Sequence, residues 1–218
     1  MIVAMDGPAG CGKSTIARLL SERMGFLYIN SGNIYRALTY AAITKGLGLG
    51  DEAALLATAS KALIEYDQDG SILLDGARLA AELRSAEVEA IVAQVSAVPE
   101  IRHIVNDIVR RLAEGKDVVV EGRDMTTVVF PQAELKFFID ASTEERARRR
   151  FAQGSSSMSY EEILENIRMR DEIDRNKKMG ALKIAPDALY LDTSGLTIEA
   201  VYEKVYSEIL HLREAHGE

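Results

Sequence analysis

The first 24 residues constrain the fold more than any other segment of the chain. An apolar run over residues 1–5 leads into Gly7-Pro8-Ala9-Gly10-Cys11-Gly12-Lys13-Ser14, and a helical pattern over residues 13–24 follows. The eight residues match G-x-x-x-x-G-K-[ST], a pattern that requires a strand before it and a helix after it. Glycines let the backbone wrap closely around phosphate groups, and the helix N-terminus adds a favourable dipole. We therefore predict a strand–loop–helix segment that binds a nucleoside triphosphate.

The rest of the chain alternates short apolar runs with helical patterns. Further strands are expected over residues 27–29, 118–121, 135–140 and 188–191. Helices are expected over residues 13–24 and 31–45, along the apolar face from Ile101 to Leu112, after a capping box of Ser142 with Glu145, and from Ile198 to Leu212. This alternation predicts an α/β fold: a five-stranded parallel sheet with helices on both faces.

Two segments depart from the alternation. Residues 62–80 contain the turn signals Asp69-Gly70 and Asp75-Gly76 between short apolar runs, which predicts a small antiparallel β insert within residues ~60–98. Residues 153–159, with the sequence QGSSSMS, are rich in small polar residues and are expected to form a short mobile lid.

Composition limits the compartment and the partners. A chain of 218 residues favours one domain, and its single cysteine excludes an internal disulfide framework and fits a reducing cytoplasm. The net charge of −8 argues against broad binding to nucleic acids or anionic membranes, and no apolar run approaches the ~18 residues of a membrane helix. We expect a cytoplasmic, monomeric protein whose partners are small molecules.

The phosphate-binding loop indicates a nucleotide but not the reaction. Lys13 is expected to reach the β- and γ-phosphates, and the Ser14 hydroxyl is expected to bind Mg²⁺. A GTPase requires an N/T-K-x-D motif, which the chain lacks; the D-x-x-G match at residues 192–195 is interpreted as a turn after the last strand. The length suits a small-molecule kinase, whereas a nucleotide-binding switch protein would need a base-reading motif and a partner surface.

Charged residues outside the loop are candidates for the acceptor site. Ser31 is expected to cap the second helix. Arg36 either binds phosphate oxygens bidentately or is a solvated arginine. On the helix expected over residues 160–175, the stripe of Ile163 and Ile167 continues to Arg170 and Asp174. These two charges could serve the transferring phosphate and a sugar hydroxyl, or form an i,i+4 salt bridge.

Two further charged groups leave alternatives open. Arg146, Arg149 and Arg150 share one helical side, either as a solvated face or as arginines that close on donor phosphates. Arg123 and Asp124 end the apolar strand of VVVEGRDM, where the aspartate could bind Mg²⁺, form a salt bridge, or read a substrate amino group.

Together these segments resemble the bacterial cytidylate kinase family, within the nucleoside monophosphate (NMP) kinases of the P-loop kinase class. The stretches that carry the resemblance span nearly the whole chain: DGPAGCGKST (6–15), SGNIYRA (31–37), EGRDMTTVVFP (121–131), FFIDASTEERARRR (137–150), RDEIDRNK (170–177) and LDTSGLTIEAV (191–201). The resemblance implies transfer of phosphate from ATP to CMP or dCMP with Mg²⁺. A kinase for another small acceptor, such as UMP, dTMP or a non-nucleotide, is the alternative.

The resemblance also implies the parts of the domain. The core would comprise residues 1–30, 99–152 and 176–218, the NMP-binding part with its insert residues 31–98, and the lid with its following helix residues 153–175.

Roles for individual residues follow from the same resemblance. The residues implied to bind ATP are Gly7, Pro8, Ala9, Gly10, Cys11, Gly12, Lys13, Ser14, Thr15, Arg146 and Arg150. Those implied to bind CMP are Ser31, Arg36, Arg102, Arg123, Asp124, Arg170 and Asp174, and those implied to stabilise the transferring phosphoryl group are Lys13, Arg123 and Arg170. The chain departs from the family at Ala93, where a serine often contacts the base, and at Lys177, where arginine is common.

Overall fold

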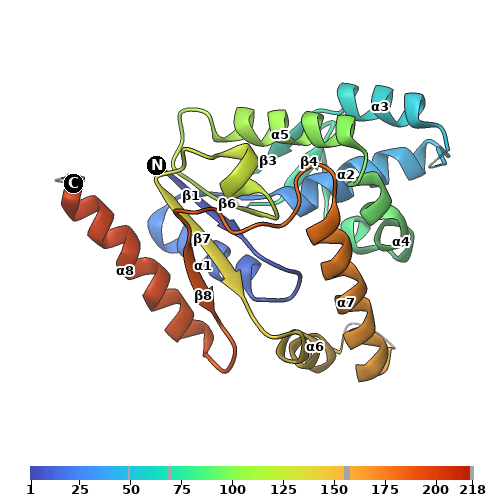
Figure 1. The fold of residues 1–218 in the computed structure, drawn as a ribbon. Helices are drawn as coiled ribbons and strands as arrows, with labels where there is room; N and C mark the ends of the chain where they lie inside the picture. The colour runs from blue at the N-terminus through green and yellow to red at the C-terminus, as the bar shows by residue number, and fades with distance from the viewer. Residues whose placement is uncertain (49, 68–69, 155–157, 217–218) are drawn as a thin grey trace. The chain divides into compact units, whose positions relative to one another are not determined.

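A computed structural model describes residues 1–48, 50–67, 70–154 and 158–216 (Figure 1). The chain forms two compact units. The first, called the sheet unit, comprises Met1–Tyr28 and Lys116–Glu218, and the second, called the inserted unit, comprises Ile29–Gly115.

The sheet unit contains a five-stranded parallel sheet, as the sequence predicts. The strand order is β2-β6-β1-β7-β8. The strands are β1 (Ile2–Asp6), β2 (Leu27–Asn30, which ends in the inserted unit), β6 (Val118–Gly122), β7 (Leu135–Asp140) and β8 (Leu189–Asp192). The register aligns Asp6 with Gly122 and Asp140 with Asp192, so the carboxyl ends of β1, β6, β7 and β8 lie at one edge. The loops that carry the phosphate-binding motif and Arg123-Asp124 therefore leave the sheet at the same edge.

Five helical elements belong to the described part of the sheet unit. They are α1 (Lys13–Met24), η2 (Met125–Val129, a short π-helical turn), α6 (Thr143–Ala152), α7 (Tyr160–Asn176) and α8 (Ile198–His216). Apolar residues of α1, such as Leu20, and of α8, such as Val205, form one core with Val3 and Phe137 of the sheet. α6 and α7 pack against each other around Ala147, Ile163 and Ile167 (Figure 1). The expected inward stripe of Ile163 and Ile167 is thus confirmed.

Both α6 and α7 start where expected, but their capping boxes differ from the prediction. The Ser142 hydroxyl accepts a hydrogen bond from the Glu145 N–H, but the Glu145 carboxylate binds Arg148 and Arg149 instead of completing the capping box. The predicted box at Ser142 is therefore only half formed, because the arginines of the same helix compete for its carboxylate. A complete capping box joins Ser159 and Glu162 at the start of α7.

The inserted unit is mainly helical and contains the expected small antiparallel sheet. Its helical elements are α2 (Ser31–Thr44), α3 (Glu52–Lys61), η1 (Ala81–Arg84), α4 (Ala86–Val95) and α5 (Pro99–Ala113). Its strands are β3 (Ile64–Tyr66), β4 (Ile72–Leu74) and β5 (Ala77–Leu79), in the order β3-β4-β5. Asp75 and Gly76, both at positive φ, make the second predicted turn.

Some sequence predictions fall where no structural statement is made. Asp69 of the first turn signal, and residues 155–157 of the expected lid, lie outside the described residues. Among the residues that are described, no helix is long and apolar enough to cross a membrane.

The residue that caps the start of α2 differs from the one expected from the sequence. Asn30, not Ser31, is the N-cap residue, because the Asn30 side chain accepts a hydrogen bond from the Asn33 N–H at 3.1 Å. Ser31 is instead the first helical residue and is buried. Asparagine and serine are comparable caps, so pattern alone does not fix the boundary to one residue.

Candidate nucleotide site

The phosphate-binding loop of the sheet unit adopts a conformation that only glycine tolerates at its start. Gly7 has φ 150°, and a Cβ atom there would lie 1.9 Å from the Ile139 carbonyl oxygen of β7. Gly10 has φ 81°, and its Cβ would lie 3.4 Å from Cβ of Arg146. The loop is thus pressed against the ends of β7 and α6, which holds its backbone close to the edge of the sheet.

The loop leads directly into the N-terminus of α1. Gly12 is the N-cap residue at φ 99°; it has no side-chain cap, and the first turn of α1 contains no acidic residue. A helix start that lacks both a side-chain cap and an acidic neighbour leaves its dipole available to an anion. The Lys13 ammonium lies within the loop, donating to the Pro8 carbonyl oxygen at 2.7 Å, while Ser14 and Thr15 are exposed.

The segment after β6 is anchored by an aspartate that precedes the phosphate-binding loop. Asp6, fully buried at the end of β1, accepts hydrogen bonds from the N–H groups of Met125 and Thr126 and from the Thr126 hydroxyl, at 2.6–2.9 Å. It therefore caps the start of η2 from a neighbouring strand. Asp124, which is also buried, immediately precedes this turn, and its carbonyl oxygen accepts from the N–H groups of Val128 and Val129.

Burial makes Asp6 an unusual acid. Removal from water raises the pKa of its carboxyl group from 3.8 to about 6; the hydrogen bonds from Thr126 and Met125 lower it in part, and the nearby Asp124 raises it further. Asp6 consequently titrates within two pH units of neutrality.

The structure brings together two predicted site residues from distant parts of the chain. Nε of Arg123 donates to Oδ2 of Asp174 at 2.7 Å, and Nζ of Lys177 donates to Oδ1 of Asp174 at 2.6 Å. Burial of Asp174 opposes ionisation, but the charges and hydrogen bonds of Arg123 and Lys177 outweigh it and hold the pKa of this carboxyl well below its ordinary value. The end of β6 and the C-terminal part of α7 are thereby joined by a charged cluster that is ionised at neutral pH.

The arginines of α6 have three different environments. Arg146 is buried and bonds to the phosphate-binding loop and to Asp171 of α7. Arg149 is half-buried and donates to the Thr193 carbonyl oxygen at 2.7 Å and to the Cys11 carbonyl oxygen at 3.4 Å. Arg150 is exposed. The three arginines that spacing places on one side of the helix therefore have different surroundings: Arg146 is internal, Arg149 lies at the loop, and Arg150 is in solvent.

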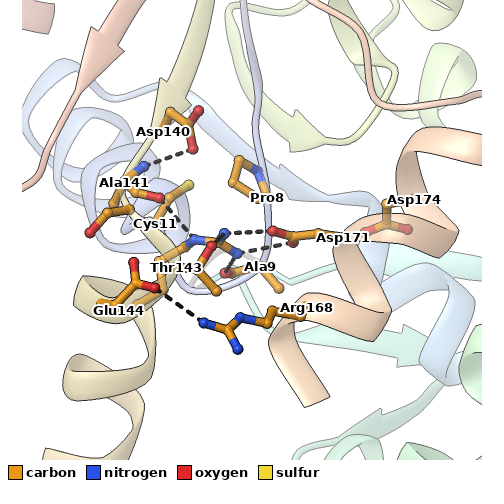
Figure 2. Close-up of polar contacts among 12 residues, drawn as sticks. Pro8, Ala9, Cys11, Asp140, Ala141, Thr143, Glu144, Arg168, Asp171 and Asp174 are labelled. Atoms are coloured by element: carbon orange, nitrogen blue, oxygen red, sulfur yellow. Dashed lines mark hydrogen bonds and ion pairs between the residues drawn. The ribbon is translucent and has the colours of Figure 1, made fainter. Parts of the chain in front are cut away.

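Arg170 lies on α7 just before the two aspartates, Asp171 and Asp174, that hold this helix. It is half-buried, one position before the buried Asp171 and one turn before the buried Asp174. The Asp171 carboxylate accepts hydrogen bonds from Nη1 and Nη2 of Arg146, at 3.0 and 2.5 Å, which Figure 2 draws as dashed lines.

The inserted unit holds the other three predicted acceptor residues. Ser31 and Arg36 lie on α2; Nε of Arg36 donates to Oε1 of Glu89 on α4 at 3.0 Å. Arg102 on α5 donates to the Ser96 carbonyl oxygen at 3.1 Å, and its guanidinium lies over the Tyr35 ring at 5.7 Å from the centroid. Both arginines are largely buried, which makes a solvated role for Arg36 untenable.

Sequence reasoning missed three residues of these networks. Asp171 lies four residues after Ile167, directly on the inward stripe, so helical periodicity could have identified it. Asp6 is the only charge in β1, and a charge within an apolar strand is a detectable signal. Glu89 carries no such signal, because its pairing with Arg36 depends on how α2 and α4 pack.

Comparisons with known proteins agree along nearly the full chain. The family described as "Cytidylate kinase" matches residues 3–211. A cytidylate kinase of Caldanaerobacter subterraneus subsp. tengcongensis is 43% identical over 210 residues, covering 95% of this chain and 93% of the relative. A cytidylate kinase of Vibrio cholerae serotype O1 is 40% identical over 214 residues, covering 95% of each. A crystal structure of an uncharacterized protein from Eubacterium ventriosum shares the fold, with a TM-score of 0.54 at 10% identity, over 96% of this chain and 98% of that one.

Proposed function

The chain belongs to the cytidylate kinase family, and we propose that it transfers the γ-phosphoryl group of ATP to CMP or dCMP, giving ADP and CDP or dCDP. The observation that carries this conclusion is the arrangement at one edge of the sheet. There, the phosphate-binding loop after β1 lies beside the strand β6, whose end carries Arg123 and Asp124. Parallel α/β sheets bind their ligands at this edge.

The donor is assigned to the phosphate-binding loop. Residues 7–15 would surround the phosphates of ATP, with backbone N–H groups and the uncapped start of α1 facing the anion. Lys13 would supply a positive charge to the β- and γ-phosphates. Arg150, exposed on α6, is free of the internal contacts that hold Arg146 and is the better placed of the two to approach ATP.

The proposed acceptor residues are those that the family resemblance implies. We propose that Ser31, Arg36 and Arg123 hold the CMP phosphate, since a guanidinium binds phosphate oxygens bidentately. Arg102 and Asp124 would face cytosine, with the Asp124 carboxylate accepting from the exocyclic amino group that uracil lacks. Asp174 would accept from a sugar hydroxyl.

The proposed mechanism requires no strong base. An oxygen of the CMP phosphate forms the new bond to the γ-phosphorus, and the bond to the β-phosphate oxygen of ATP breaks, leaving ADP. The protein's contribution is to hold two polyanions in line and to offset their repulsion with Lys13, Arg123 and Arg170. The pairing of Arg123 and Lys177 with Asp174 supports this view, because it fixes cationic groups before any substrate binds.

Magnesium fits the donor side of this site. Mg²⁺ is bound in kinases by one or two protein oxygens together with substrate phosphates, and the exposed Ser14 hydroxyl at the start of α1 offers such an oxygen. When bound, the ion would neutralise charge on the transferring phosphoryl group. We further propose that the chain acts as a monomer in the cytoplasm, where ATP and CMP are available, with neither nucleic acid nor membrane as a partner.

A panel of acceptors tests the proposal. ADP release would be measured in a coupled assay with ATP, Mg²⁺ and each of CMP, dCMP, UMP and dTMP, with Lys13→Ala as the matched inactive control. We expect kcat/KM to be highest with CMP or dCMP. Equal rates with UMP and CMP would defeat the assignment to cytosine, and ADP release without an acceptor would point to a nucleotide switch. Ala93 stands where the family resemblance implies a serine, so comparing the CMP-to-UMP ratio of the wild type with that of Ala93→Ser measures what that hydroxyl contributes.

A further inference from the structure

Every hydrogen-bond donor of the Arg146 guanidinium has an acceptor within the protein. Nε donates to the Ala141 carbonyl oxygen at 2.9 Å, and Nη1 donates to the Ala9 carbonyl oxygen at 3.2 Å and to Oδ1 of Asp171 at 3.0 Å. Nη2 donates to the Thr143 hydroxyl at 3.2 Å and to Oδ2 of Asp171 at 2.5 Å. A guanidinium has five N–H donors, and these contacts use all five.

The same side chain is almost completely removed from solvent. Arg146 is 2% exposed, and Asp171 is 6% exposed. A phosphate oxygen could reach this guanidinium only if one of its protein contacts broke. Three of the five contacts, to the Ala141 carbonyl and to both Asp171 oxygens, are buried, and breaking any of these would leave a buried acceptor without its donor. This environment does not suit the donor-phosphate contact that the family resemblance implies for Arg146.

Asp171 connects the guanidinium to the helix that carries the proposed catalytic arginine. It lies on α7, three residues before Asp174, so both carboxylates project from the same side of the helix. Asp171 is tied to the phosphate-binding loop through Arg146, and Asp174 is tied to the end of β6 through Arg123. Arg170 is therefore held on a helix that is fixed at two successive turns.

We propose that Arg146 and Asp171 act as a positioning pair, which fixes the phosphate-binding loop against α7 and so sets the place of Arg170 relative to the transferring phosphoryl group. The inference rests on the proposed phosphoryl transfer and assigns Arg146 a role different from direct contact with ATP. Neither residue touches the substrates in this account. Their effect on the reaction is exerted through the loop backbone at Ala9 and through α7.

An exposed ion pair between the same two helices provides a matched control. Arg168 of α7 and Glu144 of α6 approach to 3.4 Å, with side chains 54% and 62% exposed (Figure 2). This pair joins α6 to α7 without touching the phosphate-binding loop. Arg168→Gln should leave kcat and both KM values close to those of the wild type, because an exposed pair contributes little.

The test compares single and double variants with steady-state kinetics, each shown by circular dichroism to be folded at the assay temperature. We expect Asp171→Asn and Arg146→Lys each to lower kcat about 10- to 100-fold, because small displacements of reacting groups cost rate on this scale. The KM values for ATP and CMP should change less than about threefold, as expected for a loss confined to the transition state. The double variant Arg146→Lys/Asp171→Asn should lose no more than the larger single effect.

A second double variant separates positioning from stability. Arg146→Met/Asp171→Leu replaces the buried pair by apolar side chains, which often keeps or improves folding stability. We expect this variant to fold but to keep a low kcat. Recovery of wild-type kcat in it would show that the pair only stabilises the fold. A large rise in the KM for ATP with Arg146→Lys but not with Asp171→Asn would show instead that Arg146 contacts the donor.

Failure of the inference is distinguishable from failure of the proposed function. The wild type is first assayed with each acceptor, and a preference for an acceptor other than CMP would overturn the proposed function alone. The variants are then compared with the wild type on the acceptor that the wild type uses fastest. The ratios of kcat test the positioning pair whichever acceptor that is.

Discussion

Asp6 offers a prediction whose size follows from the structure. The folded protein raises the pKa of this carboxyl from 3.8 to about 6, chiefly through burial. Because the pKa is raised on folding, the group's contribution to the free energy of unfolding is fully present below pH ~3.8 and is lost as the pH rises through about 6. The difference between the two pKa values corresponds to about 3 kcal/mol.

The perturbation is Asp6→Asn, which keeps the shape of the side chain and one acceptor oxygen but does not titrate. The assay is urea unfolding of both proteins, followed by far-ultraviolet circular dichroism, from pH 4.5 to 7.5. About 2 of the ~3 kcal/mol falls within this range, so the stability of the wild type relative to the variant should decline by about 2 kcal/mol as the pH rises. All other titrating groups are common to both proteins and cancel in the difference.

Two results would refute this reasoning. The first is a stability difference that does not change with pH, which would mean that Asp6 titrates alike in the folded and unfolded chains. The second is a carboxyl carbon resonance of Asp6 that titrates near pH 4 in the folded protein. A midpoint near 6 is expected, and it would confirm that burial outweighs the hydrogen bonds from Met125 and Thr126.

Three further substitutions test separate parts of the site. Lys13→Ala should lower kcat by about 10²-fold or more, the scale on which one charge-stabilising group acts, and near-normal turnover would contradict its role. Gly7→Ala should abolish ATP binding in equilibrium titrations, because its Cβ would lie 1.9 Å from the Ile139 carbonyl oxygen; normal affinity would mean that the loop can move away from β7. Asp124→Asn should reduce kcat/KM for CMP more than the affinity for ATP, whereas equal losses would indicate that Asp124 binds the metal.

Local patterns predicted the sheet unit well because its elements are encoded by contiguous residues. The five strands lie within one residue of the expected ranges at each end, and α1 matches at both ends. Period-two and 3.6-residue patterns, together with the fixed spacing of the phosphate-binding loop, contain this information directly. The turn signal Asp75-Gly76 and the short apolar runs likewise predicted the small antiparallel sheet of the inserted unit.

The networks around the site were less predictable because they join residues far apart in the chain. Asp6 caps a turn that begins 119 residues later, and Arg146 meets a carboxylate 25 residues away. Spacing placed Arg146 beside Arg149 and Arg150 on one helical side, yet tertiary packing buried the first, set the second against the loop and left the third exposed. The roles of individual residues toward ATP and CMP remain predictions that the kinetic tests address.

The most direct measurement follows the phosphorus atoms themselves. The chain is mixed with ATP, Mg²⁺ and CMP, and the reaction is observed by ³¹P nuclear magnetic resonance. The account predicts that the γ-phosphate signal of ATP disappears while the β-phosphate signals of ADP and CDP grow in equal amounts. Release of inorganic phosphate with CMP unchanged, or no loss of the γ-phosphate signal, would contradict the assignment.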